Sequence, residues 1–130
     1  MAKTRTIGGR ENGTARSSDG RLDVRFAAPG AARIGTNPEQ LFAAAWSASF
    51  ESAIAIAARK RKTALPAEMV INAEVDLNGI GDDYFLNAQL NISLPCINRD
   101  TAQALIEEAH AICPYSKATR GNIEVAIKLI

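Results

Sequence analysis

The chain has 130 residues, which fits one domain spanning residues 1–130 and leaves no room for two ordinary ones. Hydrophobic residues make up 47% and charged residues 22%, proportions that exclude a disordered chain. Fifteen Lys and Arg oppose fourteen Asp and Glu, and without a basic surplus we expect no binding to nucleic acid. Only 5% of the residues are aromatic, so we expect an oligomer that completes its core with a second subunit.

Location in the cell is predicted from the N-terminus and the cysteines. No apolar run follows the first basic residues, so no secretory signal is expected. Cys96 and Cys113 have neither metal-site spacing nor the pattern of a disulfide framework, which favours a reducing cytoplasm and no metal. Residues 41–58 are apolar, but Glu51 would cost roughly 2.5–3.5 kcal/mol at a bilayer centre. We therefore predict a buried helix and no membrane association.

The first thirty residues are predicted to form short strands at residues 3–7, 14–17 and 22–26. The third alternates apolar and charged side chains, as a strand with one buried face does. Gly8-Gly9 and Ser18-Asp19-Gly20 read as the breaks between them, and Pro29-Gly30 ends the third. These features predict a small sheet before the first helix.

A long helix is predicted from residue 37 to about residue 62. Asn37 can cap it, Pro38 suits its first position, and Gln40 follows the cap by three residues. Four basic residues at its end suit the negative pole of the helix dipole. Because it is rich in alanine and apolar nearly all round, we expect a helix surrounded by protein.

The second half of the chain alternates strands with one more helix. Strands are expected at residues 71–77 and 86–94 with a hairpin loop at 79–83. A second helix begins near Asn98 or Asp100, carries an apolar stripe and is stopped by Pro114. A final strand covers residues 123–129. This order predicts an α+β fold with a mostly antiparallel sheet.

Two separated motifs resemble a known family. The first is NPEQLFAA followed by SASF within residues 37–50, and the second is CPYSKATRGN at residues 113–122. Together they resemble the OsmC/Ohr family, and within it the organic hydroperoxide resistance proteins, from Gly8-Gly9-Arg10 to the last strand. The resemblance implies an OsmC-like intertwined homodimer, with a long central helix, that reduces organic and fatty-acid hydroperoxides through a reactive cysteine. It also implies that the reactive cysteine forms a disulfide with a second cysteine. Dihydrolipoyl groups of a lipoylated protein, or another dithiol, then reduce that disulfide, so no bound cofactor is implied.

The attacking cysteine of the family aligns with Ser49 in this chain. By the same resemblance, the resolving cysteine is Cys113, the catalytic arginine is Arg10, and the glutamate at the helix start is Glu39. A guanidinium beside a thiol lowers the pKa of that thiol, and Glu39 would hold Arg10 by a paired contact. A serine hydroxyl is a far weaker nucleophile and cannot follow the oxidation steps of cysteine, so we expect no peroxide turnover.

The origin of Ser49 is left open by the sequence. An engineered Cys→Ser change and a natural loss of the nucleophile both explain it, and the intact remainder of the motif favours engineering slightly. Glu39 precedes Ser49 by ten residues on one predicted helix, about 15 Å along its axis at roughly 1.5 Å per residue. In a continuous helix Glu39 therefore cannot lie beside Ser49 of the same chain, and the simplest arrangement is a dimer in which it reaches the partner's Ser49.

The substrate pocket is expected to be apolar and to suit lipid or aryl hydroperoxides over hydrogen peroxide. Its expected lining consists of Phe42, Trp46, Phe50 and Tyr115. Taken without the motifs, Cys113 would be an inert core cysteine and Arg10 a solvated loop charge. Whether Glu51 and His110 face the site is left open.

Two other functions compete with a thiol peroxidase. One is a non-catalytic module in which Ser49 is native and the pocket holds an apolar ligand. The other is a serine hydrolase, which would require His110 to reach Ser49. No nucleophile-elbow pattern surrounds Ser49, so the hydrolase ranks third.

Overall fold

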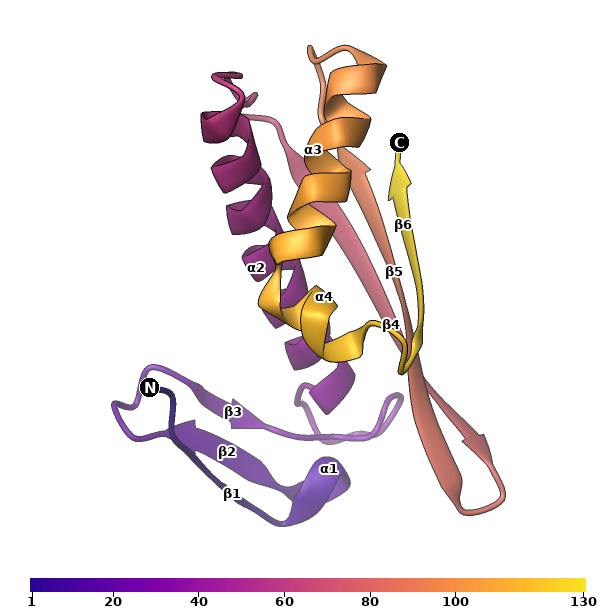
Figure 1. The fold of residues 1–130 in the computed structure, drawn as a ribbon. Helices are drawn as coiled ribbons and strands as arrows, with labels where there is room; N and C mark the ends of the chain where they lie inside the picture. The colour runs from indigo at the N-terminus through magenta and orange to yellow at the C-terminus, as the bar shows by residue number, and fades with distance from the viewer. The chain divides into compact units, whose positions relative to one another are not determined.

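The computed structural model describes all residues from Met1 to Ile130. Its polypeptide divides into two compact units, Met1–Phe42 and Ala43–Ile130. Helix α2 (Pro38–Lys60) begins in the first unit and continues into the second, where most of its residues lie (Figure 1). Each unit contains one three-stranded sheet.

The first unit is an antiparallel sheet in the order β1-β2-β3. Its strands are β1 (Thr4–Ile7), β2 (Thr14–Ser17) and β3 (Asp23–Arg25), and a single helical turn, α1 (Gly9–Asn12), connects β1 to β2. Gly13 closes this connection, because a side chain there would overlap the carbonyl oxygens of Ile7 and Gly9. The three strands were predicted, whereas the sequence showed only a turn where α1 forms.

Few side chains of the first unit are buried. The buried apolar ones are Ala15, Phe26 and Ala27, and every residue of β1 is exposed. Arg33 ties the long loop before α2 to the sheet, because its guanidinium donates to the carbonyls of Phe26 at 2.9 Å and Gly13 at 3.3 Å. This unit therefore depends on hydrogen bonds of its loops more than on an apolar core.

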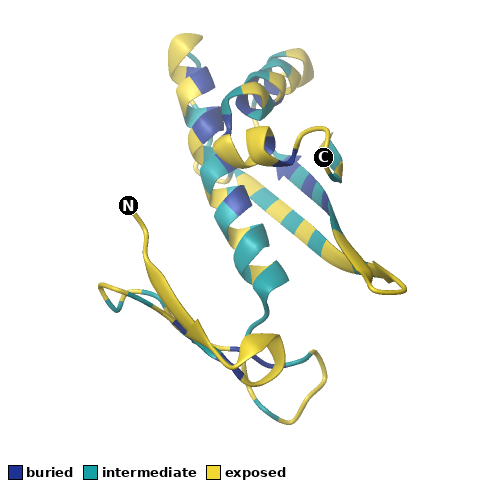
Figure 2. Cartoon of the chain, turned by 60° about the horizontal axis from the view of Figure 1, so that its bottom comes forward, coloured by how far each residue is buried: buried dark blue, intermediate teal, exposed yellow.

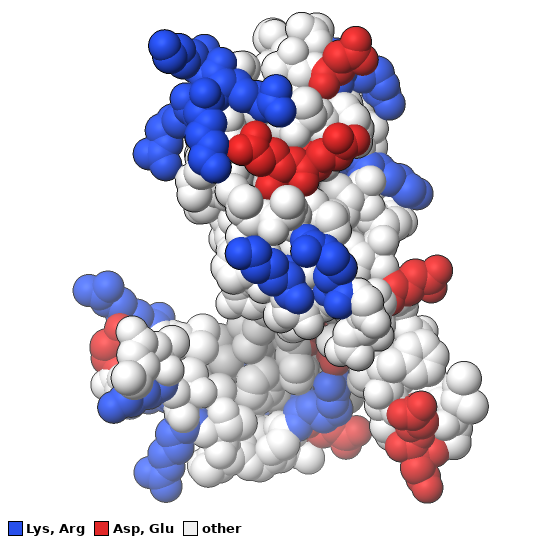
Figure 3. All heavy atoms as spheres, in the orientation of Figure 1, with Lys and Arg blue, Asp and Glu red and all other residues white.

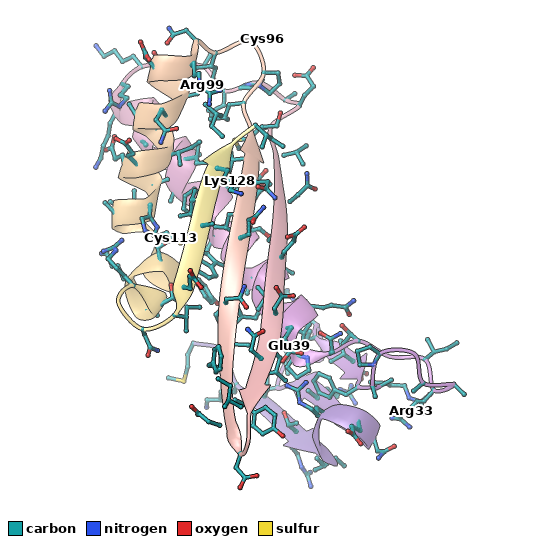
Figure 4. The ribbon with its side chains drawn as sticks, turned by 90° about the vertical axis from the view of Figure 1, so that its right-hand side faces the viewer. Arg33, Glu39, Cys96, Arg99, Cys113 and Lys128 are labelled. Atoms are coloured by element: carbon teal, nitrogen blue, oxygen red, sulfur yellow. The ribbon has the colours of Figure 1, made fainter.

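The second unit is one layer of helices on one face of a sheet (Figures 1 and 4). The sheet has the order β4-β5-β6, and the helices that follow α2 in the chain are α3 and α4. Their bounds are β4 (Val70–Ile80), β5 (Asp83–Ser93), α3 (Arg99–Ile112), α4 (Pro114–Thr119) and β6 (Glu124–Leu129).

Pairing in this sheet is antiparallel between β4 and β5 and parallel between β5 and β6. The parallel pair arises because α3 and α4 carry the chain back before β6 begins, as a crossover must. Alternate residues of β5 are buried against the helices, and Leu105 of α3 packs with Ala57 and Ala58 of α2. The predicted α+β class with mostly antiparallel pairing is confirmed.

Both long helices begin at an asparagine cap. The side chain of Asn37 accepts the backbone N–H of Gln40 at 2.8 Å, and Pro38 is the first residue of α2. The side chain of Asn98 accepts the backbone N–H of Thr101 at 2.9 Å, so Asn98 and not Asp100 caps α3. Of the two helix starts left open by the sequence, the structure selects the earlier one.

Two local predictions need correction. The hairpin loop is shorter than residues 79–83, because β4 runs to Ile80, β5 starts at Asp83, and Gly81 takes a positive φ of 59° in the turn. Pro114 ends α3 but also begins α4, since proline suits the first position of a helix.

Helix α2 is not surrounded by protein within one chain. Figure 2 shows it striped by exposure, with buried, intermediate and exposed residues alternating along it. Its inner face buries large residues such as Trp46, Phe50 and Ile54, whereas one outer stripe is exposed. That stripe, which we call the open stripe, consists of Ala44, Ala48, Ser52 and Ile56.

Length and composition alone would let α2 cross a membrane, a test that core helices of globular proteins also pass. The hydroxyls of Ser47 and Ser52 donate back to helix carbonyls, and Glu51 lies half-buried between them. At its C-terminal end, basic residues gather beside acidic ones, and Lys60 and Arg61 both pair with Glu108 of α3 (Figure 3). Charges thus fix this end of α2 to α3.

Candidate functional site

Residue 49 and Cys113 meet inside the second unit. The Cys113 thiol donates to the Ser49 hydroxyl with 3.7 Å between sulfur and oxygen. Cys113 is completely buried, and Ser49 is half-buried on α2. The two residues are 64 positions apart, so their contact comes from the packing of α2 against the junction of α3 and α4.

Cys113 occupies the bend between two helices. It lies after the last residue of α3 and before Pro114, with the extended backbone angles φ −62° and ψ 126°. Its own N–H donates to the carbonyl of Ala109 at 2.8 Å, and its carbonyl accepts the N–H of Lys117 at 3.0 Å. The bend thus satisfies its backbone groups while turning the thiol toward α2.

A second polar contact joins α2 to α4 beside the first. The indole N–H of Trp46 donates to the hydroxyl of Ser116 at 3.3 Å, and both residues are completely buried. From the other side, the Arg120 guanidinium donates to the backbone carbonyl of His110 at 2.5 Å and so ties α4 back to α3. Sequence reasoning missed Ser116 and Arg120, although both lie in the second motif.

His110 lies beside this junction in surroundings that disfavour its charged form. Its ring lies 6.5 Å from the ring of Phe50, centroid to centroid. Burial, and secondarily the charge of Arg120, lower the pKa of His110. Its Nδ1 atom is buried with no hydrogen-bond partner, so that atom is not bonded to Ser49. The histidine–serine pair that a hydrolase needs is therefore not built through Nδ1.

Arg10 and Glu39 form a two-pronged ion pair in the first unit. The Arg10 guanidinium donates to Glu39 through Nη2 at 2.7 Å and through Nη1 at 3.2 Å. Helix α1 supplies Arg10, and the first turn of α2 supplies Glu39. These hydrogen bonds lower the pKa of Glu39 and raise that of Arg10. The structure thus fixes a charged arginine whose side chain is still 45% exposed.

The expected pocket residues differ in exposure. Trp46 and Phe50 are completely buried, so neither offers surface to a ligand in a single chain. Tyr115 is 37% exposed on α4, and Phe42 is half-buried in the first unit. The structure brings Trp46 and Phe50 into the same packed region as Ser49.

Cys96 lies away from this region. Figure 4 places Cys96 and Cys113 at opposite ends of α3, and Cys96 is exposed. No three residues of the metal-binding types His, Cys, Asp and Glu are grouped closely enough to hold a metal ion. The paired polar groups at residues 49 and 113 therefore remain the candidate chemical centre of the second unit.

Comparison with known proteins gives one consistent family. Residues 29–128 match the family described as OsmC-like protein. The organic hydroperoxide resistance protein of Xanthomonas axonopodis pv. citri is 42% identical over 132 residues, which cover 98% of this chain and 92% of that protein.

Solved structures agree with that result. The crystal structure of the organic hydroperoxide resistance protein OhrB of Bacillus subtilis superimposes with a TM-score of 0.92 and 38% identity, covering 100% of this chain and 98% of that one. A Vibrio cholerae protein described as a putative organic hydroperoxide resistance protein gives a TM-score of 0.90 and 32% identity, with 99% and 90% of the two chains covered. It was crystallised with captopril in one of its active sites.

Proposed function

Because this chain belongs to the OsmC-like protein family and its relatives are named for organic hydroperoxide resistance, we propose that its fold is built for thiol-dependent reduction of organic hydroperoxides in oxidative-stress defence. We further propose that Ser49 leaves the chain, as written, without its attacking thiol. The observation that carries the proposal is the contact of 3.7 Å between Cys113 and Ser49.

With a thiol at position 49, the chemistry would run in two balanced steps. The thiolate attacks the outer oxygen of a hydroperoxide, the O–O bond breaks, and the alcohol leaves after taking one proton, which gives a sulfenic acid. The Cys113 thiolate then attacks the sulfenic sulfur and releases its oxygen as water, which forms a disulfide. An external dithiol, for which we propose the dihydrolipoyl group of a lipoylated protein, reduces that disulfide, and no bound cofactor is needed.

Arg10 and Glu39 supply the charge for the first step in this proposal. A guanidinium near position 49 would stabilise the thiolate and the developing oxyanion, and Glu39 would fix its orientation. Because α2 is one continuous helix from Pro38 to Lys60 and rises about 1.5 Å per residue, we propose that the pair serves the partner subunit in a homodimer.

The test is the variant Ser49→Cys. We expect it to consume cumene hydroperoxide in the presence of dihydrolipoamide, with a marked preference over hydrogen peroxide, whereas the unchanged chain consumes neither. The control Ser49→Cys/Cys113→Ser should form no intramolecular disulfide, because no resolving thiol remains. A folded Ser49→Cys variant that leaves the organic hydroperoxide untouched would refute the proposed function.

Dimerisation and location can be tested separately. Light scattering at micromolar concentration should give twice the mass of one chain, and a monomer would overturn the two-subunit site. Fractionation of cells should recover the protein with the cytoplasm.

The second candidate is a non-catalytic module that binds an apolar ligand. The observation in its favour is that a serine stands at the attacking position while Cys113, Arg10 and Glu39 are kept. In that case a fatty acid should raise the melting temperature of the unchanged chain, and Ser49→Cys should gain no peroxidase activity.

A further inference from the structure

We propose that the buried hydrogen bond between Trp46 and Ser116 is a positioning device that holds Cys113 opposite position 49 for disulfide formation. We call these two residues the register pair. The inference rests on the proposed function, because it concerns the second step of that chemistry. It assigns positioning roles to Ser116, which sequence reasoning missed, and to Trp46, which was expected only to line the substrate pocket.

The two contacts between α2 and the start of α4 have matching spacings along the chain. Trp46 precedes Ser49 by three residues on α2, and Cys113 precedes Ser116 by three residues at the start of α4. Residues three apart on α2 lie on the same face, and the N-cap residue of a helix lies beside the third residue of that helix. The two helical segments therefore touch at two successive points, the 3.3 Å contact of the register pair and the 3.7 Å contact of Cys113 with Ser49.

Burial decides which of these contacts sets the register. Trp46 and Ser116 both have 0% exposure, and a buried N–H that loses its acceptor suffers the full cost of desolvation. A thiol is a weak donor, so the contact between Cys113 and Ser49 cannot resist sliding by itself. A shift of α4 along α2 would break the hydrogen bond between Trp46 and Ser116, so the register pair opposes that shift.

The bend at Cys113 explains why such a device is needed. Cys113 has extended backbone angles between two helices and makes no side-chain cap to α4. A disulfide requires its two sulfur atoms about 2.05 Å apart, so the side chains must approach by roughly 1.7 Å from the present contact. With Ser116 anchored to α2, that approach takes place at Cys113 and not by movement of α4.

The placement of Cys113 matters because a sulfenic acid at residue 49 can undergo two competing reactions. Attack by the Cys113 thiolate gives a disulfide and water, whereas a second hydroperoxide molecule oxidises it to a sulfinic acid and leaves as the alcohol. The first reaction is intramolecular, and its rate depends on how well the two sulfur atoms are placed. The register pair should therefore protect position 49 from over-oxidation.

The experiment uses the full chain carrying Ser49→Cys as parent. Trp46→Phe and Ser116→Ala each remove the register pair, and Thr119→Val is the matched control. Thr119 is also a buried hydroxyl on α4, but it donates to carbonyls of its own helix, those of Tyr115 and Ser116. Circular dichroism and melting temperature verify folding in each variant.

Two measurements are made on each variant. Mass spectrometry follows disulfide against sulfinic acid over a series of cumene hydroperoxide concentrations, together with the rate of the first attack. In the parent, disulfide and sulfinic acid form in equal amounts at some hydroperoxide concentration. We expect that concentration to be about tenfold lower in Trp46→Phe and Ser116→Ala, because each loses one buried hydrogen bond. In Ser116→Ala the rate of first attack should stay within about twofold, and Thr119→Val should behave as the parent.

Equilibration with glutathione redox buffer gives the second measurement, the effective concentration of the two thiols. Since this needs no hydroperoxide chemistry, it tests the positioning role even if the proposed function fails. We expect a similar loss, about tenfold, for the two variants that remove the register pair. An unchanged effective concentration in both, or an equal loss in Thr119→Val, would overturn the inference.

Discussion

The ion pair between Arg10 and Glu39 gives a prediction about the stability of the first unit. Replacing Glu39 with glutamine keeps the shape of the side chain and removes the charge that Arg10 contacts at 2.7 and 3.2 Å. The pair joins α1 to the first turn of α2 across 29 residues, so its loss should loosen the connection between them. We expect Glu39→Gln to lower the free energy of unfolding.

The size of the effect follows from exposure. Hydrogen bonds to charged groups contribute roughly 1.5–3 kcal/mol when buried, and solvent reduces exposed ion pairs to roughly 0.2–1 kcal/mol. The Glu39 side chain is 15% exposed, but that of Arg10 is 45% exposed and thus well solvated. The two-pronged geometry places this pair at the upper end of the range for exposed ion pairs. We therefore expect a coupling energy of about 1 kcal/mol at low ionic strength.

The assay is a double-mutant cycle. Glu39→Gln, Arg10→Gln and the double variant are unfolded in urea at pH 7, with and without added salt, and followed by circular dichroism. The pair Arg16–Asp23 is the control, because its atoms are 3.9 Å apart and its side chains are 69% and 65% exposed. The coupling at Arg10–Glu39 should exceed the control and shrink in salt. Equal coupling in both pairs would refute the reasoning from geometry.

Three further predictions concern the second unit. The pKa of His110 is lowered from 6.5, so as the pH falls the unfolded chain binds this proton before the folded chain does. The free energy of unfolding should therefore decline below pH 6.5, and His110→Gln should flatten that decline in urea titrations. Leu105→Ala should cost about 3 kcal/mol in urea unfolding, since Leu105 is completely buried against Ala57 and Ala58. Asn98→Ala should cost about 1 kcal/mol in the same assay, because its cap to Thr101 is lost.

Local sequence signals predicted the long elements well because their evidence lies within a few neighbouring residues. The cap at Asn37 with Pro38, and the alternation of β4 and β5, need no information from distant parts of the chain. The short helices α1 and α4 were missed, since four and six residues carry too little periodicity to be recognised. In both places a glycine or a proline was read as an end, although each also begins a helical turn.

The candidate site also has residues that local motifs identified and a contact that only the fold shows. Its named residues came from the motifs, and the structure places Arg10 against Glu39 and Cys113 against Ser49. The contact of Trp46 with Ser116 joins residues 70 positions apart, and no local pattern predicts it. The sequence predicted Trp46 as a lining residue of the substrate pocket, and only the packing shows that its N–H has a buried partner.

The open stripe of α2 is a run of mostly small side chains that one chain leaves exposed. The chain has 5% aromatic residues and so few large apolar side chains, and within one chain the outer side of α2 stays exposed. Small residues at Ala44, Ala48 and Ser52 let another backbone approach closely, and Ile56 continues the stripe beside a shallow hollow that reaches Leu65. The tip of the β4–β5 hairpin also exposes apolar side chains, since Ile80 and Tyr84 are 73% and 67% exposed. We propose that a second copy of the chain covers both regions in the homodimer.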